Sequence, residues 1–352
     1  MLFMKKPDTS KIDQTWPESG LEHVGKCAYC GSTGRTLAYK DVQDWSFYCA
    51  PGKWTYWDCT VCKSMYLDPR PTQDTIGTAY AVYYTHNEEI SAKKTNKYNI
   101  SKFIQLVKNG YLNVTLGTNY SDNLTFPSWF YRIIGGLGLL PRSPLHDISR
   151  RPPGKLLDIG CGGGKFLKFA KELGWEVVGI ELDENAVKTA RGVGLNVIHG
   201  SFSELSQLNQ QFDVIVCSHV LEHVYDPTSL IELALSRLIQ NGELWIQWPN
   251  PRADGRELFG AHWRGLEAPR HIGIPSLGAL QHMVSNANIK GFVVDKSPYW
   301  LWSKMSMYAS SKEIFNKETL SNSRTSIKSL VNYMFSRKKI KQCELCVVTI
   351  KR

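Results

Sequence analysis

A glycine-rich turn directly after a short apolar stretch sets the strongest limit on the fold of this 352-residue chain. The segment reads Leu156-Leu-Asp-Ile-Gly-Cys-Gly-Gly-Gly-Lys-Phe-Leu167 and predicts a strand, a tight turn and the start of a helix. Glycines let the backbone approach a ligand, and the N-terminus of the helix points free amide groups toward it. Glu181 ends the next predicted strand about 20 residues on, where a carboxylate binds ribose hydroxyls. We therefore expect a nucleoside-containing ligand at this turn.

The turn departs from the fingerprint of dinucleotide-binding proteins. Asp158 precedes the first glycine, and no spacing of small residues fits G-x-G-x-x-G. A carboxylate here would repel a pyrophosphate, whereas it tolerates a positively charged sulfonium. At this point the sequence resembles the class I methyltransferases that use S-adenosylmethionine (SAM), whose first motif reads much like residues 156–167.

The resemblance covers nearly all of residues 154–297. It continues through His199-Gly-Ser-Phe202, the stretch from Phe212 to Pro227, and Asn241-Gly242 before a predicted strand. It implies that the glycines approach the methionine part of SAM and that Glu181 takes the ribose. It also implies that Leu182 and Phe202 flank the adenine and that Ser218 or His219 closes the pocket. The full set of implied SAM-binding residues is Asp158, Gly160, Cys161, Gly162, Gly164, Glu181, Leu182, Ser201, Phe202, Ser218 and His219.

After Pro152-Pro153-Gly154, short apolar strands alternate with helical stretches, which predicts an α/β fold with a Rossmann-like, seven-stranded sheet. Helices are expected near 164–173, 183–191, 227–239 and 276–286, and a polar, aromatic insertion on the substrate side over 249–274. The expected strands lie near 155–160, 176–181, 195–199, 212–217, 243–248, 291–296 and 344–350.

Four of the nine cysteines form the pairs Cys27-x-x-Cys30 and Cys59-x-x-Cys62. Four thiolates close a tetrahedral shell around a structural zinc ion, so a small zinc ribbon is expected. The 28 residues between the pairs require a long loop, and Cys49 is an alternative ligand. The other interpretation is that these are reduced cysteines of a small core. We expect loss of the metal to have a local effect, because the large sheet should fold without the module.

The sequence predicts four parts: a mobile arm over 1–24, a zinc-ribbon-like module over 25–84, a helical linker or lid over 85–153, and the methyltransferase domain over 154–352. The arrangement resembles methyltransferases with an N-terminal zinc-binding module, including sugar C-methyltransferases and enzymes of bacterial surface-polysaccharide pathways. Besides the cysteine pairs, four segments carry this resemblance: Tyr66-Leu-Asp-Pro-Arg-Pro-Thr72, Pro249-Asn-Pro251, Phe259-Gly-x-x-Trp263 and Ala268-Pro-Arg-His271.

A hydroxyl acceptor has to lose a proton, and histidine is the side chain that titrates near neutrality. His219, Glu222 and His223 are spaced to share one side of a helical turn. The segment resembles one that carries metal-binding carboxylates and a histidine in the ubiquinone-biosynthesis O-methyltransferases, although here His219 stands at the first position in place of Glu. The alternative is that Glu222 and His223 cap or orient the following loop. The catalytic candidates, in order, are His223 and His271, then His219, Glu222 and His262, with Arg270 expected to hold an anionic group.

A net charge of +10 favours anionic partners. The first hypothesis is a SAM-dependent methyltransferase acting on a saccharide or other small-molecule intermediate, mainly on oxygen, with sugar C-methylation as an alternative. RNA methylation is the other alternative, but Ser218-His-Val-Leu-Glu-His223 lacks the Asn/Asp-Pro-Pro-aromatic motif of enzymes that methylate base nitrogens, which argues against a nucleic-acid partner. A binding module that has lost its catalytic activity does not fit the intact glycine turn.

The apolar runs are too short to span a bilayer, so we expect a cytoplasmic protein. The oligomeric state and the acceptor stay open.

Overall fold

The computed structural model describes residues 10–80, 151–285, 287, 291–297 and 345–352, together with isolated positions between 106 and 148. The first nine residues of the predicted arm and most of the predicted linker lie outside the described residues. Two compact units are distinguished, one formed by residues 1–84 and 217–352 and the other by residues 85–216. Among the described residues, no helix has the length and apolar character needed to cross a membrane.

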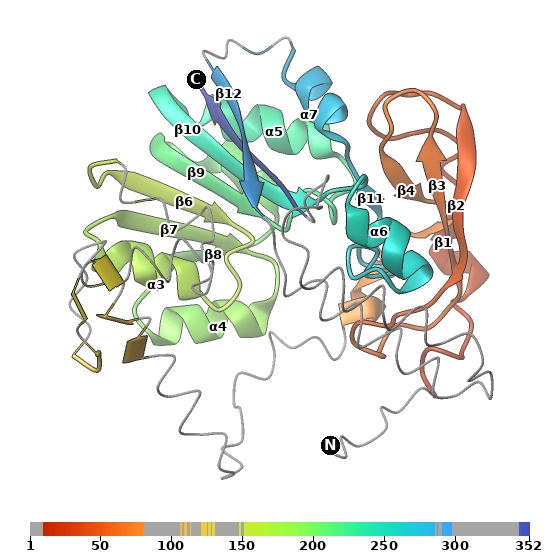
Figure 1. The fold of residues 1–352 in the computed structure, drawn as a ribbon, viewed down its shortest axis with the longest axis horizontal. Helices are drawn as coiled ribbons and strands as arrows, with labels where there is room; N and C mark the ends of the chain where they lie inside the picture. The colour runs from red at the N-terminus through yellow and green to blue at the C-terminus, as the bar shows by residue number, and fades with distance from the viewer. Residues whose placement is uncertain are drawn as a thin grey trace. The chain divides into compact units, whose positions relative to one another are not determined.

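A seven-stranded sheet runs in the order β12-β13-β10-β9-β6-β7-β8 (Figure 1). Each of the seven predicted strands is present, so the predicted fold class is confirmed. The strands are β6 (Lys155–Ile159), β7 (Glu176–Glu181), β8 (Val197–His199), β9 (Phe212–Ser218), β10 (Leu238–Pro249), β12 (Gly291–Ser297) and β13 (Leu345–Lys351).

In the unit of residues 85–216, β6, β7 and β8 pair in parallel. The residues of β6 and β7 are buried along most of each strand, as expected for a parallel sheet that is covered on both faces. Helix α3 (Lys165–Glu172) packs against β7, and helix α4 (Glu184–Gly192) packs against β7 and β8. Helix α4 begins where the Asp183 side chain accepts hydrogen bonds from the amides of Asn185 and Ala186. A 3-10 helix, η5, covers Phe202–Gln207.

In the other unit, β13 is antiparallel to both β10 and β12. Strand β10 begins five residues before the predicted strand, because helix α5 (Pro227–Ser236) ends earlier than expected. Two further short helices, α6 (Asp254–Phe259) and α7 (Leu277–Met283), lie in the segment that the sequence assigned to the insertion and to the helix after it. The remaining 3-10 helices are η1 (Glu18–Gly20), η2 (Ile76–Tyr80) and η6 (Gly260–His262).

The same unit contains a second, four-stranded sheet in the order β11-β4-β3-β2. Strands β2 (Arg35–Val42), β3 (Trp54–Cys59) and β4 (Met65–Leu67) come from the cysteine-containing module. Strand β11 (Gly273–Ile274) comes from the end of the insertion and pairs with β4. A separate pair joins β1 (Leu21–Glu22) to β5 (Arg70–Pro71). The insertion is therefore built into the cysteine module through a strand.

Candidate functional site

The glycine turn follows β6 and leads into α3. Gly160, Gly162 and Gly164 have φ values of 71°, 54° and 79°, in the left-handed region that favours glycine. The amides of Gly160 and Cys161 both donate to the carbonyl oxygen of Ile180, at 2.8 and 3.2 Å. The turn is therefore fastened to the end of β7.

Gly162 and Gly164 are needed for different reasons. A Cβ atom added at Gly162 would meet nothing within 4 Å, so the backbone there is open to a ligand. A Cβ atom added at Gly164 would overlap the side chain of Leu195 and lie 3.1 Å from Cβ of Ala190. Gly164 therefore allows α3 to start close against its neighbours, whereas Gly162 exposes its backbone.

Glu181 fixes the shape of the turn. One carboxylate oxygen accepts the amide of Gly162 at 2.7 Å, and the other accepts the amide of Asp183 at 2.9 Å. Each carboxylate oxygen can accept a second hydrogen bond, so the group can hold the turn and still bind a hydroxyl.

Asp158 is buried beneath the turn, with an exposed fraction of 5%. Burial, and after it the negative charge of Glu181, raises the pKa of Asp158 to about 8. Near neutral pH the carboxyl group is therefore mostly protonated, and a cation placed beside it favours its ionised form.

The other predicted SAM-binding residues differ in exposure. Leu182 is 69% exposed, and Phe202 is half-buried at the start of η5. Ser201 is the N-cap residue of η5, where its hydroxyl accepts the amide of Ser203 at 3.2 Å. The thiol of Cys161 is buried above Gly179, and burial raises its pKa. Ser218 is half-buried at the end of β9. The SAM-binding roles of these residues stay predictions.

Four sulfur atoms meet in the N-terminal module. Those of Cys27, Cys30, Cys59 and Cys62 all lie within 4.8 Å of one another, with Cys27–Cys62 and Cys30–Cys59 separations of 3.5 Å. Such a group fits the tetrahedral shell of a structural zinc ion. Cys49, the alternative ligand, lies instead beside Asp44 and the carbonyl oxygen of Ala79, at 3.5 and 3.6 Å.

The segment from His219 to His223 was expected to be a helical turn, and this expectation is wrong. His219 has a φ of 56°, so the chain cannot continue from β9 into a helix, and a single hydrogen bond from the His223 amide to the Val220 carbonyl closes a turn. The turn still brings Nδ1 of His219 to 3.1 Å from a carboxylate oxygen of Glu222. Nε2 of His219 lies 2.9 Å from the side-chain amide of Gln247.

Glu222 is fully buried, while the side chain of His219 is 32% exposed. Burial alone would raise the pKa of Glu222, but the hydrogen bond from His219 and the nearby histidines hold it below its usual value. One carboxylate oxygen of Glu222 has no hydrogen-bond partner within the part of the chain that the structure describes. The pair is therefore a buried carboxylate linked to an imidazole that reaches solvent.

His223 and His271 also lie close to Glu222. Their rings meet edge to face with centroids 4.6 Å apart, and one ligand atom from each lies within 4.8 Å of a Glu222 oxygen. Nδ1 of His271 donates to the Gly265 carbonyl at 2.7 Å, and Nδ1 of His223 lies 2.9 Å from the hydroxyl of Tyr80. Burial lowers the pKa of His223, and it lowers that of His271 to about 4. Two imidazoles and one carboxylate are a donor set that suits divalent transition metals.

Arg270 was expected to bind an anionic group, and the structure contradicts this. Its side chain is fully buried, and its guanidinium pairs with Asp44 at 2.5 Å and with Glu267 at 3.2 Å. The charges of Arg264, His271 and Arg270 outweigh burial and hold the pKa of Glu267 well below its usual range. The charge of Arg270 is thus neutralised inside the protein. His262 stacks against Trp45, with ring centroids 5.1 Å apart.

Three residues at these sites were missed from the sequence: Tyr80, Gln247 and Asp44. Gln247 lies near the carboxyl end of a predicted strand, where ligand-facing residues of α/β sheets gather, so its position was a usable signal. Tyr80 and Asp44 contact His223 and Arg270 over long sequence separations, and no local pattern marks them.

Comparison with known proteins gives concordant results. A family model described as "Methyltransferase domain" matches residues 138–292. The ubiquinone biosynthesis O-methyltransferase of Ruegeria sp. (strain TM1040) is 34% identical over 42% of this chain and 67% of its own length. The corresponding protein of Xanthomonas axonopodis pv. citri (strain 306) is 32% identical over 37% of this chain and 63% of its own length. A SAM-dependent methyltransferase structure from Archaeoglobus fulgidus is 17% identical, with a TM-score of 0.41, over 64% of this chain and all of that chain.

The glycine turn, Glu181 and the seven-stranded sheet agree with these matches, and the chain belongs to the class I SAM-dependent methyltransferases. Within that class it is similar to the ubiquinone biosynthesis O-methyltransferases. It spans 67% of the length of one of these relatives and 63% or less of the others compared.

Proposed function

We propose that this enzyme methylates a hydroxyl oxygen of a small-molecule acceptor. The observation that carries the proposal is the similarity to relatives named as O-methyltransferases. A saccharide acceptor is the finer part of the proposal and is supported by the resemblance to methyltransferases with a zinc-binding module. The proposal includes one structural zinc ion held by Cys27, Cys30, Cys59 and Cys62, and a cytoplasmic location in which these thiols stay reduced.

SAM binds, in this proposal, at the turn of residues 158–164. The open backbone at Gly162 supports an approach by the methionine part, and the free acceptor capacity of Glu181 supports a contact with the ribose. The exposed side chain of Leu182 offers an apolar surface for the adenine. Asp158 supplies negative charge when it ionises, which favours a sulfonium.

His219 and Glu222 remove the proton of the acceptor hydroxyl. The 3.1 Å contact between Nδ1 of His219 and Glu222 supports this role, because a carboxylate there fixes the tautomer and leaves Nε2 to accept a proton. In this role the acceptor hydroxyl takes the place at Nε2 that the side-chain amide of Gln247 holds at 2.9 Å. The sequence ranked His223 and His271 first; the proposal instead takes His219, because its side chain is 32% exposed whereas that of His271 is 2% exposed.

Glu222, His223 and His271 would hold a divalent metal ion if this enzyme uses one, as the resemblance to the ubiquinone-biosynthesis enzymes implies. A metal bound there would supply Lewis acidity for an acceptor oxygen. The buried Glu222 oxygen that lacks a hydrogen-bond partner within the described part of the chain fits such a role.

The proposal is tested with SAM labelled in its methyl group and two acceptor panels, one of phenols and one of saccharides, with product analysis by mass spectrometry. We expect an O-methyl product, and we expect Glu222→Gln and His219→Asn each to lower kcat by about 10²–10⁴-fold with little change in SAM affinity. His282→Asn, at an exposed position on α7, is the matched control. Methyl transfer to carbon or nitrogen only would overturn the proposal, as would changes below tenfold in both variants.

A further inference from the structure

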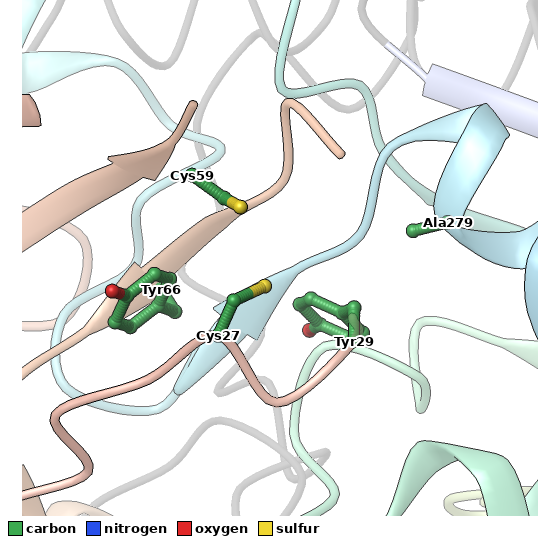
Figure 2. Packing of buried hydrophobic residues seen from close by; sticks show 5 residues of the cluster. All are labelled: Cys27, Tyr29, Cys59, Tyr66 and Ala279. Carbon is green, nitrogen blue, oxygen red and sulfur yellow. The ribbon is translucent and has the colours of Figure 1, made fainter. Parts of the chain in front are cut away.

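The cysteine cluster lies against the segment that carries His271. Figure 2 shows Cys27 and Cys59 packed with Tyr29, Tyr66 and Ala279, and Ala279 belongs to α7. Strand β11 pairs with β4, three residues beyond Cys62, and the amide of Leu67 donates to the carbonyl of Ile272 at 3.0 Å. The metal ligands are therefore part of the surroundings of residues 272–279.

Gly273 lets the segment of residues 272–279 lie close to the first cysteine pair. A Cβ atom at this position would overlap the hydroxyl of Tyr29, which stands between Cys27 and Cys30 in the first cysteine pair. The amide of Gly273 donates to the carbonyl of Glu222 at 3.3 Å. Gly273 thus connects the first cysteine pair to Glu222.

Ser64 connects the second cysteine pair to the same segment. Its side chain is fully buried, and its hydroxyl lies 3.2 Å from the sulfur of Cys62 and 2.9 Å from the amide nitrogen of Ser276. A metal-bound cysteine is a thiolate, so the Ser64 hydroxyl donates to sulfur and accepts from the amide. A metal that holds Cys62 in place therefore also holds the Ser64 hydroxyl that accepts the amide of Ser276.

Ser276 forms a second link beside the first. Its hydroxyl donates to the carbonyl of Cys62 at 2.5 Å and accepts the amide of Ala279 at 3.0 Å. Further back along the segment, the hydroxyl of Tyr56 lies 2.8 Å from the carbonyl of His271. Residues 271–276 are thus held by the cysteine module at both ends.

We propose that the metal held by the four cysteines positions His271 and Glu222 through Ser64 and Ser276, which makes Ser64 a positioning residue for methyl transfer. This inference rests on the proposed function. It replaces the expectation that loss of the metal has only a local effect.

The test uses the full chain loaded with Co²⁺ in place of zinc, and compares the parent with Ser64→Ala. Ser285→Ala is the matched control, because Ser285 is exposed after the other end of α7 and bonds the carbonyl of His282. Three signals are followed: the sulfur-to-cobalt absorption band, hydrogen exchange of the amides of Ser276 and Ala279, and the ring ¹⁵N resonances of His271. We expect Ser64→Ala to keep the absorption band, to exchange both amides about tenfold faster and to shift the His271 resonances. Ser285→Ala should match the parent.

Metal removal from the parent keeps the proposal testable if Ser64→Ala folds poorly. Chelation should accelerate exchange at the amides of Ser276 and Ala279, which lie outside the second possible metal group of Glu222, His223 and His271. Unchanged exchange after chelation would overturn the proposal, and so would a well-folded Ser64→Ala that matches the parent. SAM affinity is measured in parallel by calorimetry, because failure to bind SAM would count against the proposed function and leave the exchange result standing.

Discussion

Replacement of Asp158 by Asn should change how SAM affinity depends on pH. With a pKa of about 8, Asp158 is ionised in about one tenth of the molecules at pH 7 and in about nine tenths at pH 9. If bound SAM, which carries a positive sulfonium, selects the ionised carboxylate, its affinity should rise about tenfold between pH 7 and pH 9, or about 1.4 kcal/mol. Below pH 7 it should fall by about tenfold for each pH unit.

The assay is isothermal titration calorimetry at pH 6, 7, 8 and 9, in two buffers with different ionisation enthalpies. SAM binding to the parent should release close to one proton at pH 7 and almost none at pH 9. Asp158→Asn should bind more weakly at pH 9 and lose this component of the pH dependence. Asp183→Asn, which keeps an N-cap residue on α4, is the control. Equal parent affinities at pH 6 and pH 9 would refute the reasoning.

The raised pKa of Asp158 also predicts how the stability of the ligand-free protein depends on pH. Asp158 loses its proton near pH 3.8 when unfolded and near pH 8 when folded, so between these values the folded state binds more protons. Its contribution to stability is therefore present below about pH 4 and is lost as the pH rises toward 8. Asp158→Asn should accordingly have a higher Tm than the parent at pH 7, and the difference should shrink as the pH falls toward 4.

Four further variants probe single features. Cys59→Ser should lower the zinc content of the purified chain below one ion per molecule, as measured by elemental analysis. A variant that keeps the full zinc content would contradict the proposed zinc site. Gly164→Ala should cost about 2–5 kcal/mol of folding free energy from the left-handed φ and the overlap with Leu195. Gly162→Ala should cost about 1–2 kcal/mol of folding free energy and should weaken SAM binding. Denaturant titration measures the folding free energy of the two glycine variants, and calorimetry measures their SAM affinity. If both variants lost equal stability and equal SAM affinity, the separate roles given to Gly162 and Gly164 would be wrong. Arg270→Gln should cost about 3–5 kcal/mol by leaving Asp44 buried without its cation, and unchanged urea unfolding would exclude this.

The sheet could be predicted from the sequence because its strands carry their own signal. Strands β6 and β7 are short, mainly apolar runs bounded by turn residues, with Asp158 as the acidic residue within β6, so a local pattern is enough. The glycine turn was recognisable for the same reason, since three glycines in the left-handed region lie within five residues. The helical interpretation of His219–His223 failed because spacing alone does not reveal a positive φ after a strand.

The contacts that join the His271 segment to the cysteine module could not be predicted, because they join residues that are far apart in sequence. Strand β11 has two residues, too few for any alternation to mark it, and it forms through pairing with β4 about 200 residues earlier. Arg270 looked like an anion ligand because its partner Asp44 is separated from it by 226 residues. A buried arginine needs a buried carboxylate, and only the fold reveals which one supplies it. Arg270 is held by Asp44 and Glu267 and has a structural role, whereas its sequence neighbour His271 belongs to the group for which we propose a catalytic role.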